Sequence, residues 1–126
     1  MHKILFTFTG IVKHNLGRGR KLGYPTANID VPATTPEGLF VGITKHKDKV
    51  YQALIFIGPA VTFEETDKKA EIYILDFDED IYGETLTTEI LHKLRDNEKF
   101  TTVEALIEKM RNDEINARNF FNKDKK

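Results

Sequence analysis

The sequence predicts a mainly β protein, a barrel of short strands with one C-terminal helix, and three observations lead to it. Over the first hundred residues, runs of β-branched and aromatic residues alternate with turn residues. Beyond residue 100, apolar residues recur instead at helical spacing. The chain has 126 residues, enough for one core and too few for two ordinary domains. We therefore expect residues 1–126 to form one domain in which a helix packs on a barrel.

Six segments have the composition of strands and are bounded by turn residues. They span residues 4–13, 26–31, 39–45, 50–57, 70–77 and 85–91. Pro25 and Pro32 bracket the second segment closely. A short polar run at 47–49 separates the third from the fourth and indicates a hairpin.

The C-terminal segment has the pattern of an amphipathic helix. Thr101-Thr102-Val103-Glu104 has the spacing of a capping box, which predicts where the helix begins. An apolar stripe follows at Val103, Leu106, Ile107 and Met110 and continues through Ala117 and Phe121. We expect the stripe to pack against the barrel, over its surface or across one end.

Composition excludes several classes of protein. Lys+Arg is 19 and Asp+Glu is 20, so no strong overall field is available to hold a polyanion, and we expect no nucleic-acid partner. The absence of cysteine excludes disulfides and thiolate chemistry. The N-terminus reads as a strand and not as a signal peptide, and no run approaches the roughly 20 apolar residues of a membrane helix. We therefore expect a cytoplasmic protein with no membrane partner.

A glycine-rich basic segment precedes the second strand. Residues 17–23 carry three glycines and three cations, which could bring backbone N–H groups and positive charge to a phosphate. The spacing is neither that of a Walker A loop nor that of the Rossmann fingerprint. From composition alone, a phosphate-binding loop and a solvated basic turn both remain open.

Thr26 and Asn28 follow this segment. If residues 25–31 are extended, positions i and i+2 place a hydroxyl and an amide oxygen on one face. Neutral oxygens suit Mg²⁺ that already carries nucleotide phosphates and water. The alternative is a turn in which both side chains hydrogen-bond to the backbone.

Glu71 is the candidate general base. Alternation along the fifth segment puts it on one face with Tyr73, Leu75 and Phe77. A carboxylate among apolar neighbours is costly unless it is paired or functional, and burial would raise its pKa. The alternative is a rim residue paired with Lys68 or Lys69.

The polar stretch 94–100 separates the last strand from the helix and ends in an aromatic residue. It could be a flap over a ligand or an ordinary connection.

Taken together, these segments resemble the riboflavin kinase family. The matching residues include Gly10-Ile11-Val12, Gly17-Arg18-Gly19-Arg20, Leu22-Gly23-Tyr24-Pro25-Thr26-Ala27-Asn28, Gly38, Ile57-Gly58, Thr62-Phe63, Glu71, Leu75-Asp76-Phe77, Asp80-Ile81-Tyr82-Gly83, Leu94-Arg95, Glu98-Lys99-Phe100 and Asp113. The stretch from Gly23 to Asn28 is the most specific of them. Two positions depart from the family: Ala60-Val61 replaces a common Arg-Pro, and Tyr73 replaces a usual histidine.

The resemblance implies a six-stranded antiparallel Greek-key β-barrel with a C-terminal α-helix. It implies phosphoryl transfer from MgATP to riboflavin, with riboflavin, FMN, ATP and ADP as the small-molecule partners. We expect the chain to be a monomer. The implied nucleotide-binding residues are Gly17, Arg18, Gly19, Arg20, Lys21, Gly23, Pro25, Thr26 and Asn28, and the last two would also ligate Mg²⁺. Glu71 would be the base, and Arg95, Glu98 and Phe100 would lie on the flavin side. A non-catalytic flavin-binding barrel and the excised kinase half of a bifunctional enzyme are the alternatives.

Overall fold

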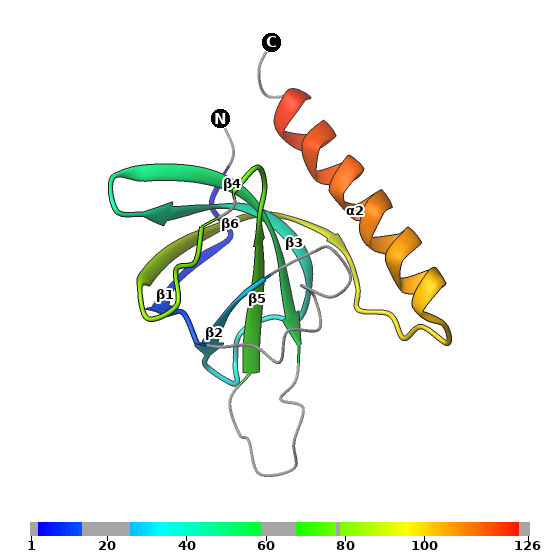
Figure 1. The fold of residues 1–126 in the computed structure, drawn as a ribbon, viewed down its shortest axis with the longest axis horizontal. Coiled ribbons are helices and arrows are strands. Elements are labelled where there is room, and N and C mark those ends of the chain that lie inside the picture. Colours follow the sequence, from blue (N-terminus) through cyan, green and yellow to red (C-terminus); the bar gives the residue numbers. More distant parts are fainter. Residues whose placement is uncertain (1–2, 14–25, 59–67, 78, 124–126) are drawn as a thin grey trace.

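The computed structural model describes residues 3–13, 26–58, 68–77 and 79–123, drawn in colour in Figure 1. This part of the chain forms six strands and one helix. The elements are β1 (Phe6–Ile11), β2 (Ala27–Val31), β3 (Gly38–His46), β4 (Lys49–Gly58), β5 (Lys68–Ile74), β6 (Thr85–Arg95) and α2 (Val103–Lys123).

The strands form one antiparallel sheet in the order β1-β6-β3-β4-β5-β2. The sheet curls so that its two outer strands approach each other, and an antiparallel bridge between Lys13 and Asn28 joins them. In this order β1 pairs with β6, the last strand of the chain. Strand β2 pairs with β5 and not with β1, its neighbour in sequence. These observations confirm the six-stranded antiparallel barrel with a C-terminal helix.

Alternation along the strands divides the apolar residues between two clusters. One fills the barrel interior and contains the fully buried Ile29, Ile55, Ile57, Ile72, Leu86 and Ile90. The other, called here the outer cluster, joins Leu39, Val41, Leu54 and Leu75 to Ala117 and Phe121 of the helix. Helix α2 accordingly runs along the outside of the barrel (Figure 1) and does not plug its end.

The start of α2 differs in detail from the sequence-based prediction. The helix begins at Val103, and the hydroxyl of Thr102 accepts a hydrogen bond from the Ala105 amide at 3.0 Å. Thr102 is thus the N-cap, so Thr101 and Glu104 are not placed as the two partners of a capping box. Val103 is 55% exposed, which removes it from the packed stripe.

The fifth strand is shorter than predicted and the sixth is longer. β5 ends at Ile74 because the chain turns at Asp76, which has a φ of 57°. The turn redirects Phe77, whose ring packs edge-on against Tyr51 at 4.9 Å, next to the interior cluster. β6 continues four residues beyond the predicted end, to Arg95.

Candidate functional site

A row of directly paired residues crosses the outer face of the sheet, called here the cross-strand row. Asn28 on β2 is opposite Glu71 on β5, and Glu71 is opposite Phe56 on β4. Phe56 is opposite Leu39 on β3, and Leu39 is opposite Arg95 on β6. Directly opposite residues share a face, with Cβ atoms about 5 Å apart. The row therefore brings together residues that the sequence assigned separately to a metal, to proton transfer and to a flavin.

Thr26 and Asn28 lie at the β2 end of the row. Ala27 and Ile29 are buried in the barrel interior, so alternation turns Thr26 and Asn28 to the outer face. The Thr26 hydroxyl donates to Glu71 Oε1 at 3.3 Å. Asn28 Oδ1 is buried with no hydrogen-bond partner among the described residues. A buried oxygen left in this way is costly, and a ligand that uses it would recover the cost.

The Thr26 and Asn28 oxygens suit a Mg²⁺ ion that is bound mainly by water and substrate phosphates. Both are neutral, and the described residues contain no group of three or more His, Cys, Asp or Glu that could hold a metal ion. Mg²⁺ commonly keeps waters and substrate phosphates and takes only one or two protein ligands. The pair formed by Thr26 and the unpartnered Asn28 oxygen is compatible with that mode of binding.

Glu71 is partly buried between Asn28 and Phe56. Tyr73 and Leu75 belong to the outer cluster, as the predicted alternation required, whereas the prediction for Phe77 is wrong because of the turn at Asp76. Glu71 thus has a polar neighbour on one side and apolar neighbours on the other.

The two lysines considered as partners of Glu71 have other described contacts. Lys68 lies 3.3 Å from a Glu37 carboxylate oxygen and donates to the Thr35 carbonyl at 2.6 Å. Lys69 forms an ion pair with Asp30. The Thr26 hydroxyl is a described donor to the Glu71 carboxylate.

Arg95 anchors the other end of the row to the helix. Its Nε and Nη2 atoms donate to the two carboxylate oxygens of Asp113 on α2 at 3.0 and 2.8 Å. Both side chains are largely buried, with exposures of 18% and 7%. The hydrogen bonds from Arg95 to Asp113 raise the pKa of this guanidinium above its ordinary value, so the cation persists at any physiological pH.

Asp113 of α2 is a functional residue for which no role was predicted. Its position in the sequence could have indicated a buried ion pair. Asp113 interrupts the apolar stripe of the helix between Met110 and Ala117, where a buried carboxylate needs a cationic partner.

The segment after Arg95 is tethered at several points. Asn97 donates from Nδ2 to the Ile57 carbonyl at 3.3 Å, and its Oδ1 is buried without a described partner. Glu98 is exposed and lies 3.4 Å from Lys109 of the helix, whereas Phe100 is partly buried. Of the predicted flavin-side residues, only Arg95 belongs to the cross-strand row.

The predicted phosphate loop lies outside the described residues. This applies to Gly17, Arg18, Gly19, Arg20, Lys21, Gly23 and Pro25, and also to Ala60-Val61. The residues that flank the loop are described: the Lys13 amide donates to the Asn28 carbonyl at 2.7 Å, and Thr26 contacts Glu71. Both flanks of residues 14–25 therefore lie at the β2 end of the row.

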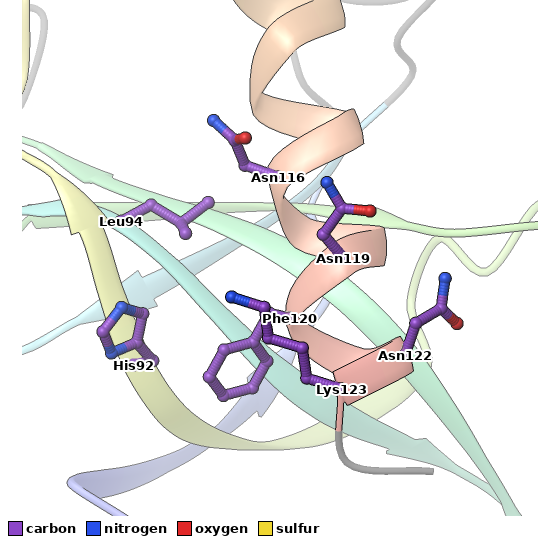
Figure 2. Close-up of a pocket in the computed structure, with 7 residues that line it drawn as sticks. All are labelled: His92, Leu94, Asn116, Asn119, Phe120, Asn122 and Lys123. Atoms are coloured by element: carbon purple, nitrogen blue, oxygen red, sulfur yellow. The ribbon is translucent and has the colours of Figure 1, made fainter. Parts of the chain in front are cut away.

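A separate pocket of about 470 Å³ lies between β6 and the C-terminal half of α2 (Figure 2). It is lined by His92, Leu94, Asn116, Asn119, Phe120, Asn122 and Lys123. The rings of His92 and Phe120 stack with centroids 5.3 Å apart. None of the predicted site residues lines this pocket, and we place the candidate site at the row because the donor chemistry is there.

Within the described ranges, no helix is long and apolar enough to cross a membrane.

The family model and the curated relatives point to one family. A family model described as "Flavokinase: Riboflavin kinase" matches residues 3–121. A trifunctional protein RibF/MnmA of Mycoplasmoides gallisepticum is 37% identical over 96% of this chain and 19% of its own length. A bifunctional riboflavin kinase/FMN adenylyltransferase of Listeria monocytogenes is 35% identical over 94% of this chain and 39% of its own length.

A solved structure supports the fold. Riboflavin kinase from Trypanosoma brucei superposes with a TM-score of 0.70 at 23% identity, over 93% of this chain and 80% of that one. The chain spans only about one fifth to two fifths of the two curated relatives.

Proposed function

This chain belongs to the riboflavin kinase family, and on that premise we propose that it transfers the terminal phosphoryl group of MgATP to the ribityl 5′-hydroxyl of riboflavin. The products are FMN and ADP. The cross-strand row is the observation that carries the proposal, because it joins Asn28, Glu71 and Arg95 on one face. Neighbouring strands lie about 4.8 Å apart, so the row spans about 19 Å across its five strands. This length is sufficient for two substrates bound end to end.

The β2 end is assigned to the nucleotide. Thr26 Oγ1 and the unpartnered Asn28 Oδ1 would hold Mg²⁺, which offsets charge on the phosphates when it is bound. Gly17, Arg18, Gly19, Arg20, Lys21, Gly23 and Pro25 are proposed to bind the nucleotide on the strength of the family motif alone.

Glu71 is assigned to the hydroxyl of riboflavin. Its carboxylate would accept a hydrogen bond from the 5′-hydroxyl and hold that oxygen in line with the terminal phosphoryl group. An alcohol is far less acidic than a carboxylic acid, so the proton moves to Glu71 late, as the new P–O bond forms and the bond to ADP breaks. The Thr26 hydroxyl keeps the Glu71 carboxylate turned toward the metal end of the row.

The flavin ring is assigned to the part of the row nearest the helix. Phe56, which is partly buried, supplies apolar surface beside Glu71, and the buried Leu39 packs next to it on the side of Arg95. Arg95, Glu98 and Phe100 would bind the flavin, with Arg95 held in place by Asp113. Aromatic and apolar surface beside a few fixed polar groups is typical of sites for planar cofactors.

The rest of the proposal concerns the chain as a whole. We expect residues 1–126 to act as one kinase domain, as a monomer in the cytoplasm, without nucleic-acid or membrane partners. We expect no adenylylation, since the sequence contains no second nucleotide motif.

Incubation with riboflavin and MgATP, followed by chromatography of the flavins, tests the proposal. FMN should appear in equal amount with ADP, and no FAD should form. A protein that bound riboflavin but consumed no ATP would be a flavin-binding barrel, and the proposed activity would be wrong.

A further inference from the structure

Lys13 extends the cross-strand row by one position beyond Asn28. The two residues are directly paired, and the Lys13 amide donates to the Asn28 carbonyl. Their neighbours Val12 and Ala27 are both buried in the barrel interior. Lys13 and Asn28 therefore turn their side chains to the same outer face, next to the assigned metal ligands.

The ammonium group of Lys13 contacts Asp30, and the same carboxylate also contacts Lys69. Asp30 thus accepts hydrogen bonds from both lysines. The trio carries a net charge of +1, and Asp30 would keep a cationic partner if one lysine left. Lys13 is the more exposed of the two lysines, at 59% against 31%, and so the freer to move.

The position of Lys13 gives its side chain two comparable directions. Asp30 lies two residues after Asn28 on β2, and Thr26 lies two residues before it, so each is a diagonal neighbour of Lys13. Diagonal neighbours are about 7–8 Å apart at Cα, within reach of a lysine. A change of rotamer would carry the ammonium group from Asp30 to the end of the row where Thr26 contacts Glu71.

We propose that Lys13 is a phosphate-binding residue, which leaves Asp30 when nucleotide enters and contacts a phosphate oxygen of the nucleotide held at Thr26 and Asn28. The inference rests on the proposed function, because that function puts the phosphates at this place. A multiply charged phosphate attracts an ammonium group more strongly than a carboxylate already shared with Lys69. Asp30 acts as the competing anion that holds the lysine while the site is free of nucleotide.

Lys45 provides a matched control. It pairs with Glu89 at 3.2 Å on the outer face of β3 and β6, with an exposure of 45%. It lies six residues along β3 from Leu39 of the row, about 20 Å away. Lys13→Met and Lys45→Met therefore remove the same type of exposed ion pair from the outer face of the barrel. The first change lies next to the assigned site, and the second lies far from it.

The experiment measures dissociation constants for MgATP and riboflavin by calorimetric titration at low salt, together with KM and kcat. Lys13→Met should weaken MgATP binding roughly three- to tenfold, the size of a typical net hydrogen bond, because the wild-type lysine gives up its contact with Asp30 when it binds phosphate. Riboflavin affinity should stay unchanged. Lys13→Gln should reproduce the loss. Asp30→Asn should instead tighten MgATP binding, because the competing anion is removed. Lys45→Met should match the wild type.

Other outcomes would overturn the inference. If Lys13→Met and Lys13→Gln lowered the unfolding midpoint but kept the wild-type dissociation constant for MgATP, Lys13 would serve only to close the barrel. A loss of equal size in Lys45→Met would reduce the effect to overall charge. If the wild type formed FMN but the Lys13 variants kept the wild-type affinity for MgATP, the inference about Lys13 would be wrong and the proposed function would stand. A wild-type chain that bound no MgATP would sink the proposed function with it.

Discussion

Asn28 on β2 lies directly opposite Glu71 on β5, and the side-chain oxygen of Asn28 is buried without a hydrogen-bond partner among the described residues. The Thr26 hydroxyl, two residues earlier on the same face, reaches the Glu71 carboxylate. Three oxygen-bearing side chains thus converge, although Glu71 is more than forty residues from both Thr26 and Asn28 in sequence. One of them carries an unmet hydrogen-bonding capacity that a bound ligand would use.

The assigned metal ligands make the first prediction. Thr26→Ala and Asn28→Ala should each raise the Mg²⁺ concentration needed for half-maximal activity by about tenfold, because each removes an oxygen from the same strand face. Asn28→Ala should also leave stability unchanged or higher, since it removes a buried oxygen that lacks a partner. Magnesium titrations of activity and thermal unfolding measure the two effects.

The control for these variants is Thr87→Ala. The Thr87 hydroxyl pairs with that of Thr9 at 3.0 Å on the exposed face of β1 and β6, away from the row. Wild-type magnesium curves for both Thr26→Ala and Asn28→Ala would show that neither oxygen binds the metal.

Glu71→Gln tests the base. The amide keeps the size and hydrogen-bonding reach of the carboxylate but cannot accept the proton. We expect kcat to fall by roughly 10²- to 10⁴-fold while riboflavin affinity changes little. If Glu71 were only a rim residue, the change should cost about 1 kcal/mol of stability or less, with turnover nearly intact. Steady-state kinetics beside a riboflavin titration separate the two cases.

The segment 95–100 should gain protection when both substrates bind. Residues 96–100 belong to no helix or strand, and besides Arg95 their described side-chain contacts are those of Asp96 with Lys93, Asn97 with Ile57 and Glu98 with Lys109. A segment of this kind can open and close over a ligand. Hydrogen exchange of these amides, with and without riboflavin and MgADP, measures the change. Equal protection in both states would contradict the role of a flap.

The pairing of Arg95 with Asp113 should matter for stability. Asp113→Ala leaves a largely buried guanidinium without its carboxylate, and we expect a loss of about 3 kcal/mol in the free energy of unfolding. Glu114→Ala, next to it on α2, breaks a more exposed pair with Arg118 and should cost less than about 1 kcal/mol. Urea unfolding compares the two, and equal losses would refute a special role for Asp113.

Acid should weaken the contact between Glu84 and His46. His46 lies 2.6 Å from Glu84, and this hydrogen bond, with Lys47 adding to it, holds the pKa of Glu84 below its ordinary value. A carboxyl with a lowered folded-state pKa stabilises the fold above its unfolded pKa, near 4.5, and this contribution is lost as pH falls through the folded value.

Glu84→Gln should therefore be less stable than the wild type at pH 5, and the difference should shrink toward pH 3. Glu108→Gln, an exposed change on α2, serves as the control. A difference that stayed constant across this range would exclude the ionised Glu84 as its source.

Local pattern in the sequence determined much of this protein. Alternation placed Thr26 and Asn28 on one face, and helical spacing placed Ala117 and Phe121 on the packed side of α2. Each of these features depends only on residues a few positions apart in the same strand or helix, so the sequence is sufficient to predict it. The same local reasoning was wrong for Phe77, because the left-handed backbone at Asp76 ended the strand.

Only the tertiary structure decided which residues meet. The pairing of Asn28 with Glu71, of Phe56 with Leu39 and of Leu39 with Arg95 depends on the register of five strands. A shift by one residue would turn each side chain to the opposite face, and the register is set by the common interior core rather than by any one segment. The partnership of Arg95 with Asp113 likewise required the helix to dock along the outside of the barrel, a choice that the apolar stripe left open.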